Sequence, residues 1–284
     1  MPTKNRARQL KLCLDSLVIQ DFDGFDVIIA DSSDDNTTKL LCDNFQEKFF
    51  SLKYIRADKP GISAARNLIV ACCKTDLLIF VDDDVYLDKG CFKKLIDCYS
   101  KSPDPNSTAF SCMIDLHTYG VSAPGRLLSS GVGVNAHAEV ADYFISALIL
   151  LPRRIYSNIL WPERLTTYGG EDLLYGLQCR RVGFKFGFCS EILASHDREI
   201  IQRARPGPSV ASNLVYLMLY KHILVKPSLN ALLIFETYGL FRHLLWRVQP
   251  LFPNIFPISS VASTFIQYWV KGHYWFAKDV QCLK

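Results

Sequence analysis

Consecutive aspartates give the first sign of chemistry in this sequence. Asp82, Asp83 and Asp84 directly follow the apolar run LLIFV. Three adjacent carboxylates repel one another, so their clustering costs less when a cation is bound. Hard divalent ions such as Mg²⁺ or Mn²⁺ suit carboxylate oxygens and are often shared with a substrate phosphate. The alternative interpretation is a solvated acidic turn.

A second acidic group follows two glycines. Gly169-Gly170-Glu171-Asp172 opens a helical pattern that ends at Gly183. The helix dipole favours carboxylates in a first turn, which is the purely structural interpretation. The glycines, however, let a backbone approach a ligand closely. One of the two carboxylates therefore suits a general base that faces a bound acceptor.

Further along the chain, a histidine has the chemistry of a metal ligand, and two arginines have the chemistry of a diphosphate site. His196 ends a strand-like stretch, as the aspartates do, so a metal ligand and an ordinary surface or core histidine are equal alternatives. Arg203 and Arg205 precede Pro206-Gly207-Pro208. Arginine forks match phosphate oxygens, so this pair suits a diphosphate. A solvated loop is the equal alternative for the arginines.

These side chains need a sheet whose strands end at a common edge. In the first half of the sequence, apolar runs alternate with helical patterns; the runs are 25–30, 52–56 and 77–81, and the helical patterns are 36–49, 62–73 and 88–100. Such alternation predicts an α/β fold with a mostly parallel sheet and helices on both faces. Ligands gather at the carboxyl ends of such strands, where Asp31 and Asp82 are expected.

The start of the sequence lacks one expected element. The stretch 1–6 has the pattern of a loop and is followed at once by a helical pattern. In a sheet of this type a strand normally leads into that loop. We therefore expect the first strand to be missing from this chain.

Composition narrows the class of protein. The chain has 284 residues, 49% of them hydrophobic, which fits one large domain or a domain with an extension. Its ten cysteines include no CxxC pair and no zinc-like spacing, which indicates reduced, buried thiols. The polar N-terminus has no apolar core, so we expect no signal peptide and a cytoplasmic location.

Charge divides the chain near residue 200. Residues 1–199 carry 23 Lys/Arg and 26 Asp/Glu, whereas residues 200–284 carry nine and two. The basic, aromatic-rich tail fits either a helical cap on the sheet or a peripheral contact with an anionic bilayer. Prolines interrupt the uncharged stretch 248–270, so we predict no membrane-spanning helix. No recognition motif accompanies the charge, so nucleic acid is not an expected partner.

Five motifs occur in an order that identifies a family. They are PTKNR at 2–6, Asp31 within IIADSS, GISAARN at 61–67, VDDD at 81–84 and GGED at 169–172. Together they resemble glycosyltransferase family 2, whose members are inverting enzymes of the GT-A fold that use nucleotide-sugars. The resemblance covers residues 1–200. Residues 201–284 then form a helical C-terminal extension.

The resemblance implies roles for individual residues. Asp172 is the expected base, and Glu171 positions the acceptor. Asp84 and His196 bind a divalent cation, Mn²⁺ or Mg²⁺, and Asp82 contacts the ribose or the metal. The residues expected to bind the nucleotide-sugar lie in the same motifs: Pro2, Thr3, Asn5, Arg6, Asp31, Arg66, Asp82 and Asp83. We add Arg203 and Arg205 to this binding set.

The expected function is metal-dependent, inverting glycosyl transfer. A sugar moves from a nucleotide-sugar to a hydroxyl of a glycan or lipid-linked glycan, as in polysaccharide biosynthesis for the cell envelope. The expected location is the cytoplasm, with peripheral contact at the cytoplasmic face of the membrane as the further option. The alternatives are a nucleotidyltransferase on a similar fold and a non-catalytic or truncated nucleotide-binding relative.

Overall fold

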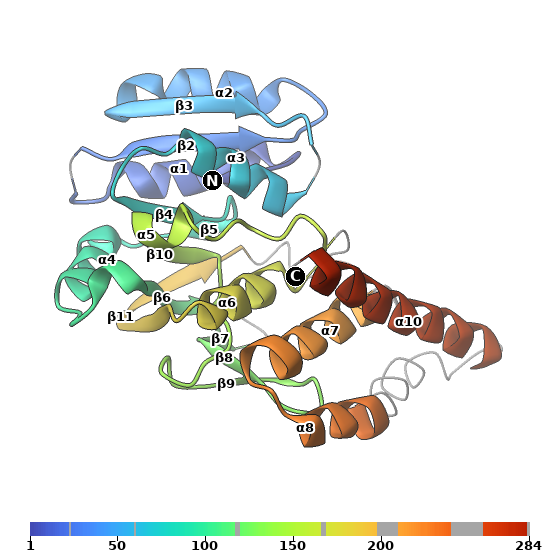
Figure 1. Cartoon of the computed structure of the whole chain (residues 1–284). Coiled ribbons are helices and arrows are strands. Elements are labelled where there is room, and N and C mark those ends of the chain that lie inside the picture. Colours follow the sequence, from blue (N-terminus) through green and yellow to red (C-terminus); the bar gives the residue numbers. More distant parts are fainter. Residues whose placement is uncertain are drawn as a thin grey trace.

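The computed structural model has three tiers, which Figure 1 shows from the N-terminal sheet through the central sheet to the C-terminal helices. The structure describes residues 1–22, 24–59, 61–116, 120–165, 169–197, 210–239 and 258–282.

The N-terminal tier is a parallel three-stranded sheet in the order β1-β2-β3, covered by helices. Its elements are β1 (Pro2–Thr3), α1 (Ala7–Val18), β2 (Asp26–Asp31), α2 (Thr37–Phe45), the 3₁₀ turn η1 (Gln46–Lys48), β3 (Ser51–Arg56) and α3 (Ile62–Cys72). Apart from β1, these elements follow the alternation predicted from the sequence.

The start of the chain differs from the expected loop. Pro2 and Thr3 pair in parallel with Ala30 and Asp31 of β2 and so form a short strand of their own. The backbone N–H groups of Ala30 and Ser32 donate to the carbonyls of Met1 and Thr3, at 3.0 and 2.9 Å. Two residues show no period, so sequence pattern alone could not distinguish this strand from a loop.

The central tier is a mixed sheet in the order β4-β10-β6-β11-β5, with β7 beside β6. Its strands are β4 (Leu77–Val81), β5 (Val85–Tyr86), β6 (Thr108–Asp115), β7 (Val121–Ser122), β10 (Leu148–Pro152) and β11 (Lys185–His196). Strands β6 and β11 are parallel, whereas β10 runs antiparallel to both β4 and β6. All five residues of β10 are buried, which explains its unbroken apolar sequence.

Helices and a hairpin complete this tier. They are α4 (Cys91–Ser100), the 3₁₀ turn η2 (Pro105–Ser107), α5 (Arg153–Tyr156), α6 (Glu171–Arg181) and the hairpin β8 (Gly125–Leu127) with β9 (Gly133–Asn135). One buried cluster joins α1, β2, α4 and β6, and a second joins α3, β4, β10 and α6. The predicted α/β class, with parallel strands flanked by helices, is confirmed.

The end of α6 matches the prediction made for Gly183. Gly183 has φ +88°, and its N–H donates to the carbonyl of Arg180 at 3.1 Å. The N–H of Phe184 donates to the carbonyl of Cys179 at 3.0 Å. These two bonds form a Schellman motif, which a glycine in the left-handed region closes at low cost.

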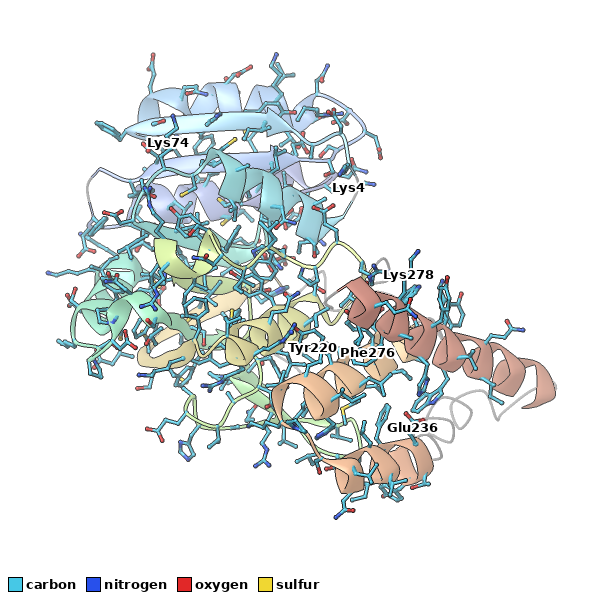
Figure 2. All side chains as sticks on the ribbon, viewed as in Figure 1. Lys4, Lys74, Tyr220, Glu236, Phe276 and Lys278 are labelled. Atoms are coloured by element: carbon cyan, nitrogen blue, oxygen red, sulfur yellow. The ribbon has the colours of Figure 1, made fainter. Side chains whose placement is uncertain are left out.

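The third tier is helical. It contains α7 (Val210–Leu219), the π-helix η5 (Tyr220–Val225), α8 (Leu229–Ile234), the π-helix η6 (Phe235–Gly239) and α10 (Ile258–Cys282). Its apolar cluster includes Leu174 and Leu177 of α6, so the tier packs on the central one. Figure 2 shows Tyr220 and Phe276 of this cluster near that junction.

Two sequence expectations concern features of the whole chain. Among the described residues, no helix combines the length and apolar composition that a bilayer crossing requires. The nine described cysteines are all free thiols, and six of them are buried. Burial raises the pKa of Cys42 and of Cys91 to about 12, so these thiols are inert at neutral pH.

Candidate active site

The three consecutive aspartates lie just beyond the carboxyl end of β4. The N–H of Asp82 donates to the carbonyl of Ala147 at 2.9 Å, which extends the pairing with the chain before β10. Asp82 is partly exposed, while Asp83 and Asp84 are buried. The three carboxylates therefore face different surroundings and have different partners.

Asp83 binds the start of the chain. Its two oxygens accept from the Thr3 hydroxyl at 2.7 Å and from the Arg6 guanidinium at 2.8 Å. Burial raises the pKa of Asp83 to about 6, although Arg6 opposes the shift. This carboxylate thus holds two of the residues that the sequence places in the nucleotide pocket.

Asp84 contacts His196, the last residue of β11. One oxygen accepts from Arg6 at 2.8 Å, and the other lies 3.3 Å from Nε2 of His196. The pairing of β11 with β5, in which His196 is opposite Val85, brings them together. Burial raises the pKa of Asp84, and His196 opposes the shift. The two residues predicted to share a cation are therefore neighbours.

The chemistry of this pair fits a divalent cation bound together with a substrate. A carboxylate oxygen and an imidazole nitrogen are both ligands for first-row divalent metals. Within the described ranges, no group of three or more His, Cys, Asp or Glu side chains is arranged to hold a metal alone. Metals that keep few protein ligands complete their coordination with water and substrate phosphates. Asp84 and His196 suit such a shared site.

Arg66 stands between the aspartates and the second acidic group. Its side chain is fully buried, with Nη2 2.9 Å from Asp82 and Nη1 3.8 Å from Glu171. The guanidinium also lies over the ring of Trp161, 4.2 Å from its centroid. Among the residues that the structure describes, none forms a hydrogen bond with Nε or Nη1 of Arg66. Buried N–H donors without partners are costly, so they favour an anionic ligand at this position.

Asn67 was not selected from the sequence, although it belongs to the GISAARN motif. Its side-chain carbonyl accepts from the N–H of Trp161 at 2.7 Å, and its amide donates to the carbonyl of Trp161 at 2.9 Å. The same amide donates to Glu163 at 2.9 Å. Asn67 therefore holds the backbone of Trp161, on whose ring Arg66 rests. The motif was the available signal, but Trp161 is 94 residues away.

Asp31 ends β2 and is completely buried. It accepts from the N–H of Ser33 at 2.8 Å, from the Tyr54 hydroxyl at 2.9 Å and from Arg56 at 3.1 Å. Tyr54 and Arg56 were not predicted from the sequence. The parallel register of β3 on β2 places Arg56 opposite Asp31, and this register was the information that could have indicated the two residues.

Asn5 links two loops at the same edge of the sheet. It has φ +54°, a conformation that asparagine tolerates better than most residues. Its backbone N–H donates to the Ser33 hydroxyl at 2.7 Å, and its amide exchanges bonds with Asp34 at 2.6 and 2.9 Å. The strand β1 and the loop after β2 are thereby held together.

Glu171 and Asp172 form the first turn of α6, as predicted. Gly169 and Gly170 have φ +89° and +99°, so both adopt conformations that favour glycine. The Asp172 carboxylate accepts from the N–H of Leu173 at 2.8 Å. Burial, and then the charge of Glu171, raise the pKa of Asp172 to about 7, although Arg66 opposes them. A carboxylate with this pKa can accept a proton near neutral pH.

Most predicted site residues come together at one edge of the first two tiers. Bonds between described side chains link Thr3 and Arg6 to Asp83, Arg6 to Asp84, and Arg66 to Asp82. Arg203 and Arg205 lie outside the described residues.

Comparison with known sequences identifies the N-terminal part. The family model for glycosyl transferase family 2 matches residues 1–110. The curated glycosyltransferase GlyA of Streptococcus pneumoniae serotype 4 is 25% identical over 101 residues. That alignment covers 34% of this chain and 14% of GlyA, so the chain matches about a seventh of its relative.

Solved structures share the fold over nearly the whole chain. S. aureus TarS 1–349 has a TM-score of 0.64 at 18% identity and covers 94% of this chain and 79% of its own. The mannosyltransferase PcManGT of Pyrobaculum calidifontis, solved with GDP-Man and Mn²⁺, has a TM-score of 0.60 at 15% identity and covers 99% and 85%. GalNAc-T7, solved with UDP, GalNAc and Mn²⁺, has a TM-score of 0.52 at 14% identity and covers 93% and 51%. The likeness therefore includes the C-terminal helices.

The likeness to these structures shows that the chain has a GT-A fold. Residues 1–110 match the model of glycosyl transferase family 2, which confirms the resemblance drawn from the motifs. The GT-A fold expected from the motifs is confirmed as well.

Proposed function

We propose that the chain is a metal-dependent glycosyltransferase that transfers a sugar from a nucleotide-sugar to an acceptor hydroxyl, with inversion. The observation that carries this proposal is the position of Arg66, whose unpartnered buried donors lie between Asp82 and Glu171. A cationic group between two acidic groups suits an anionic donor that bridges a cation site and a base. The match of residues 1–110 to the model of glycosyl transferase family 2 favours glycosyl transfer over nucleotidyl transfer.

The donor is proposed to be a nucleoside diphosphate sugar. Two proteins of the same fold were solved with such chemistry, GDP-Man in PcManGT and UDP in GalNAc-T7. We propose that Pro2, Thr3, Asn5 and Arg6, together with Asp31, form the nucleotide side of the site. The bonds that join Asn5 to Asp34 and Thr3 to Asp83 keep this side in one shape.

A divalent cation, Mn²⁺ or Mg²⁺, is proposed at Asp84 and His196, with Asp82 nearby. When bound, it would stabilise the negative charge that grows on the diphosphate leaving group. The unpartnered N–H groups of Arg66 would stabilise the same charge.

Asp172 is the proposed base. It takes the proton of the acceptor hydroxyl as the oxygen attacks the anomeric carbon, while Glu171 orients the acceptor. The bond from sugar to diphosphate breaks on the opposite face, so one displacement inverts the configuration. The raised pKa of Asp172 supports this role because a base of pKa about 7 is both available and effective at neutral pH.

The substitution Asp172→Asn tests the assignment. The amide keeps the size of the side chain but cannot accept the proton. We expect kcat to fall at least about 100-fold, the usual contribution of a positioned base, with donor affinity within about twofold of wild type. Donor binding is measured by calorimetry with UDP-, GDP-, dTDP- and CMP-sugars and Mn²⁺, and transfer by release of nucleoside diphosphate in the presence of glycan acceptors.

Asp104→Asn is the matched control, because Asp104 pairs with Lys185 away from the motifs. It should retain wild-type kcat. Turnover retained by Asp172→Asn would contradict the base assignment, and failure of every nucleotide-sugar to bind wild type would contradict the function.

We further propose that the acceptor is a glycan or a lipid-linked glycan, reached at the cytoplasmic face of a membrane. The support is one exposed face of α10. Ile266, Val270 and Tyr274 are 52–64% exposed and follow one another at four-residue spacing, so they share this face. Lys271 and Lys278 are also exposed on this helix. An apolar strip beside lysines suits the surface of an anionic bilayer.

A further inference from the structure

The helical tier contacts the stretch of chain that leads into Asp172. The side-chain amide of Asn213, on α7, donates to the carbonyl of Gly169 at 2.7 Å. The carboxylate of Asp279, on α10, forms an ion pair with Arg164. Both partners belong to the segment between Trp161 and α6. Two separate helices of the tier therefore hold the chain just before the proposed base.

The first contact, from Asn213 to Gly169, is made to a glycine pair whose backbone is conformationally free. Gly169 and Gly170 both have positive φ, and glycine has the greatest conformational freedom of any residue. Asn213 is only 1% exposed and therefore has a fixed position under the helical tier. A Cβ on Gly170 would lie 3.1 Å from Leu217 of α7, so this helix is in close contact with the turn. The direction in which α6 begins is thus set from outside the segment.

The second contact joins three parts of the chain. One oxygen of Asp279 pairs with Arg164, and the other accepts from the Tyr216 hydroxyl of α7 at 2.7 Å. Both oxygens are used, so the carboxylate has little freedom to turn. Gly272 lets α10 approach α7 closely, because a Cβ there would lie 2.6 Å from the carbonyl of Ser212. Arg164 is consequently held by a rigid helix pair.

We propose that Asn213 and Asp279 are positioning residues for Asp172, so that the helical tier is a working part of the active site. This inference rests on the proposed function. Asn213 fixes the turn that starts α6, and Asp279 fixes Arg164, five residues before Gly169. A misplacement of a reacting group by about 1 Å can cost about 100-fold in rate, so small movements of this turn matter.

A purely structural role would also make these residues sensitive to substitution, so a control within the same tier is needed. Glu236 of η6 pairs with His273 of α10 at 2.9 Å and accepts from the Trp269 indole at 3.0 Å. Figure 2 shows Glu236 beside α10, on the side of the tier away from the two sheets. Glu236→Gln should weaken only the contact of η6 with Trp269 and His273 of α10, and it leaves the bonds of Asn213 and Asp279 in place.

The experiment compares Asn213→Ala, Arg164→Glu, Asp279→Arg and the double variant Arg164→Glu/Asp279→Arg with wild type and Glu236→Gln. We expect the three single variants to lose about 10- to 100-fold in kcat, with donor Kd within about twofold of wild type. The double variant restores the ion pair in reverse and should recover most of the lost kcat. Glu236→Gln should keep wild-type kcat even where its Tm falls as far as that of Asn213→Ala.

The outcomes separate this inference from the proposed function. A wild-type chain that transfers no sugar overturns the function, and the inference with it. An active wild type with unchanged kcat in Asn213→Ala overturns the inference alone. So does a loss of kcat in Glu236→Gln equal to that in Asn213→Ala at the same Tm, because stability would then explain both.

Discussion

Asp172 gains its proposed chemistry from its surroundings. An aspartate in water has a pKa near 4 and is a weak base. Here burial and the neighbouring Glu171 disfavour the charged form, and Arg66 offsets only part of this effect. The Glu-Asp pair in a helix first turn would be a simple stabilising feature without that burial. The raised pKa makes Asp172 a candidate base.

The raised pKa predicts the pH dependence of catalysis. The base must be deprotonated, so kcat should rise tenfold per pH unit below about pH 7 and level off above it. The measurement is a kcat profile at saturating donor and acceptor. An acidic limb near pH 4, the ordinary range of an aspartate, would contradict the prediction.

The same raised pKa makes the contribution of Asp172 to stability fall as pH rises, whereas kcat rises with pH. Because the folded-state pKa of Asp172 is above the unfolded value of 3.8, the folded state binds its proton more tightly. This group therefore stabilises the fold fully below about pH 4, and that contribution is lost as pH rises towards 7.

Asp84 is the residue whose loss should remove the response to metal. We expect Asp84→Asn to weaken Mn²⁺ affinity by at least about 10- to 100-fold, the range seen when even outer-shell groups of a metal site are removed. Asp88→Asn is the matched control, because Asp88 lies four residues further on and is exposed. Mn²⁺ binding is followed by calorimetry in the presence of nucleoside diphosphate. Equal Mn²⁺ affinity in the Asp84 and Asp88 variants would show that Asp84 is not a ligand.

Residue types alone located the acidic members of the site but not their division of labour. The sequence presents Asp82, Asp83 and Asp84 as equivalent neighbours. The structure gives them different partners, which are Arg66 for Asp82, Thr3 with Arg6 for Asp83, and Arg6 with His196 for Asp84. These partners come from other strands and helices, so local pattern contains no information about them.

At the scale of elements, helix α6 shows how far local rules extend. Its start at Gly170 and its end at Gly183 follow from capping preferences and were predicted. Gly176, in its middle, has no local reason, because glycine weakens a helix interior. The reason is tertiary: a Cβ there would lie 2.8 Å from the carbonyl of Asp142 and from Cα of Tyr143.

Two glycine substitutions, one inside α6 and one just beyond its end, should therefore destabilise the fold although alanine is the better helix former. Gly176→Ala should lower the free energy of unfolding by about 2–3 kcal/mol, because the new methyl group meets rigid backbone. Gly183→Ala should cost about 1 kcal/mol, because its φ is positive but no atom lies within 4 Å of the added Cβ. Urea unfolding of both variants measures the difference. A Gly176→Ala variant more stable than wild type would show that helix propensity outweighs packing.

Strand β10 marks the limit of prediction at this scale. Its apolar sequence is compatible with a buried strand or a buried helix segment. The pairing that decides the matter joins Leu148 to Val81, which is 67 residues earlier, and Ile149 to Ser111. The hairpin of β8 and β9 was not predicted either, because its strands have three residues each and show no period.

At the scale of the molecule, the basic tail, residues 200–284, has an inner face and an outer face with different roles. One face of the helical tier packs on α6 and holds Asp142, which pairs with the buried Lys221 at 2.7 Å. The cap interpretation of the tail therefore describes this inner face. Asp279 is the one acidic residue in the sequence of α10, and it is paired with Arg164. The lysines on the outer face of α10 therefore meet no acidic side chain of that helix.

That outer face predicts binding to anionic liposomes by the full chain. The triple variant Ile266→Ser/Val270→Ser/Tyr274→Ser should lose most of the floated fraction, because burial of these side chains in the interface drives binding. Leu40→Ser/Phe50→Ser is the matched control, since Leu40 and Phe50 are 63% and 83% exposed on the N-terminal tier. Flotation that is the same for both variants and wild type would refute the membrane contact.

The position of β11 determines the order in which parts of the site can form during synthesis of the chain. The Asp84–His196 neighbourhood exists only when β11 has paired with β5, so its two members are separated by 112 positions of synthesis. The N-terminal parallel sheet can fold from residues already made, whereas the central sheet must wait for its late strands β10 and β11. Contacts between such distant residues are slow to form. A nascent chain would therefore form the proposed nucleotide side before the proposed cation side, so binding of a metal-linked donor would mark the completion of folding.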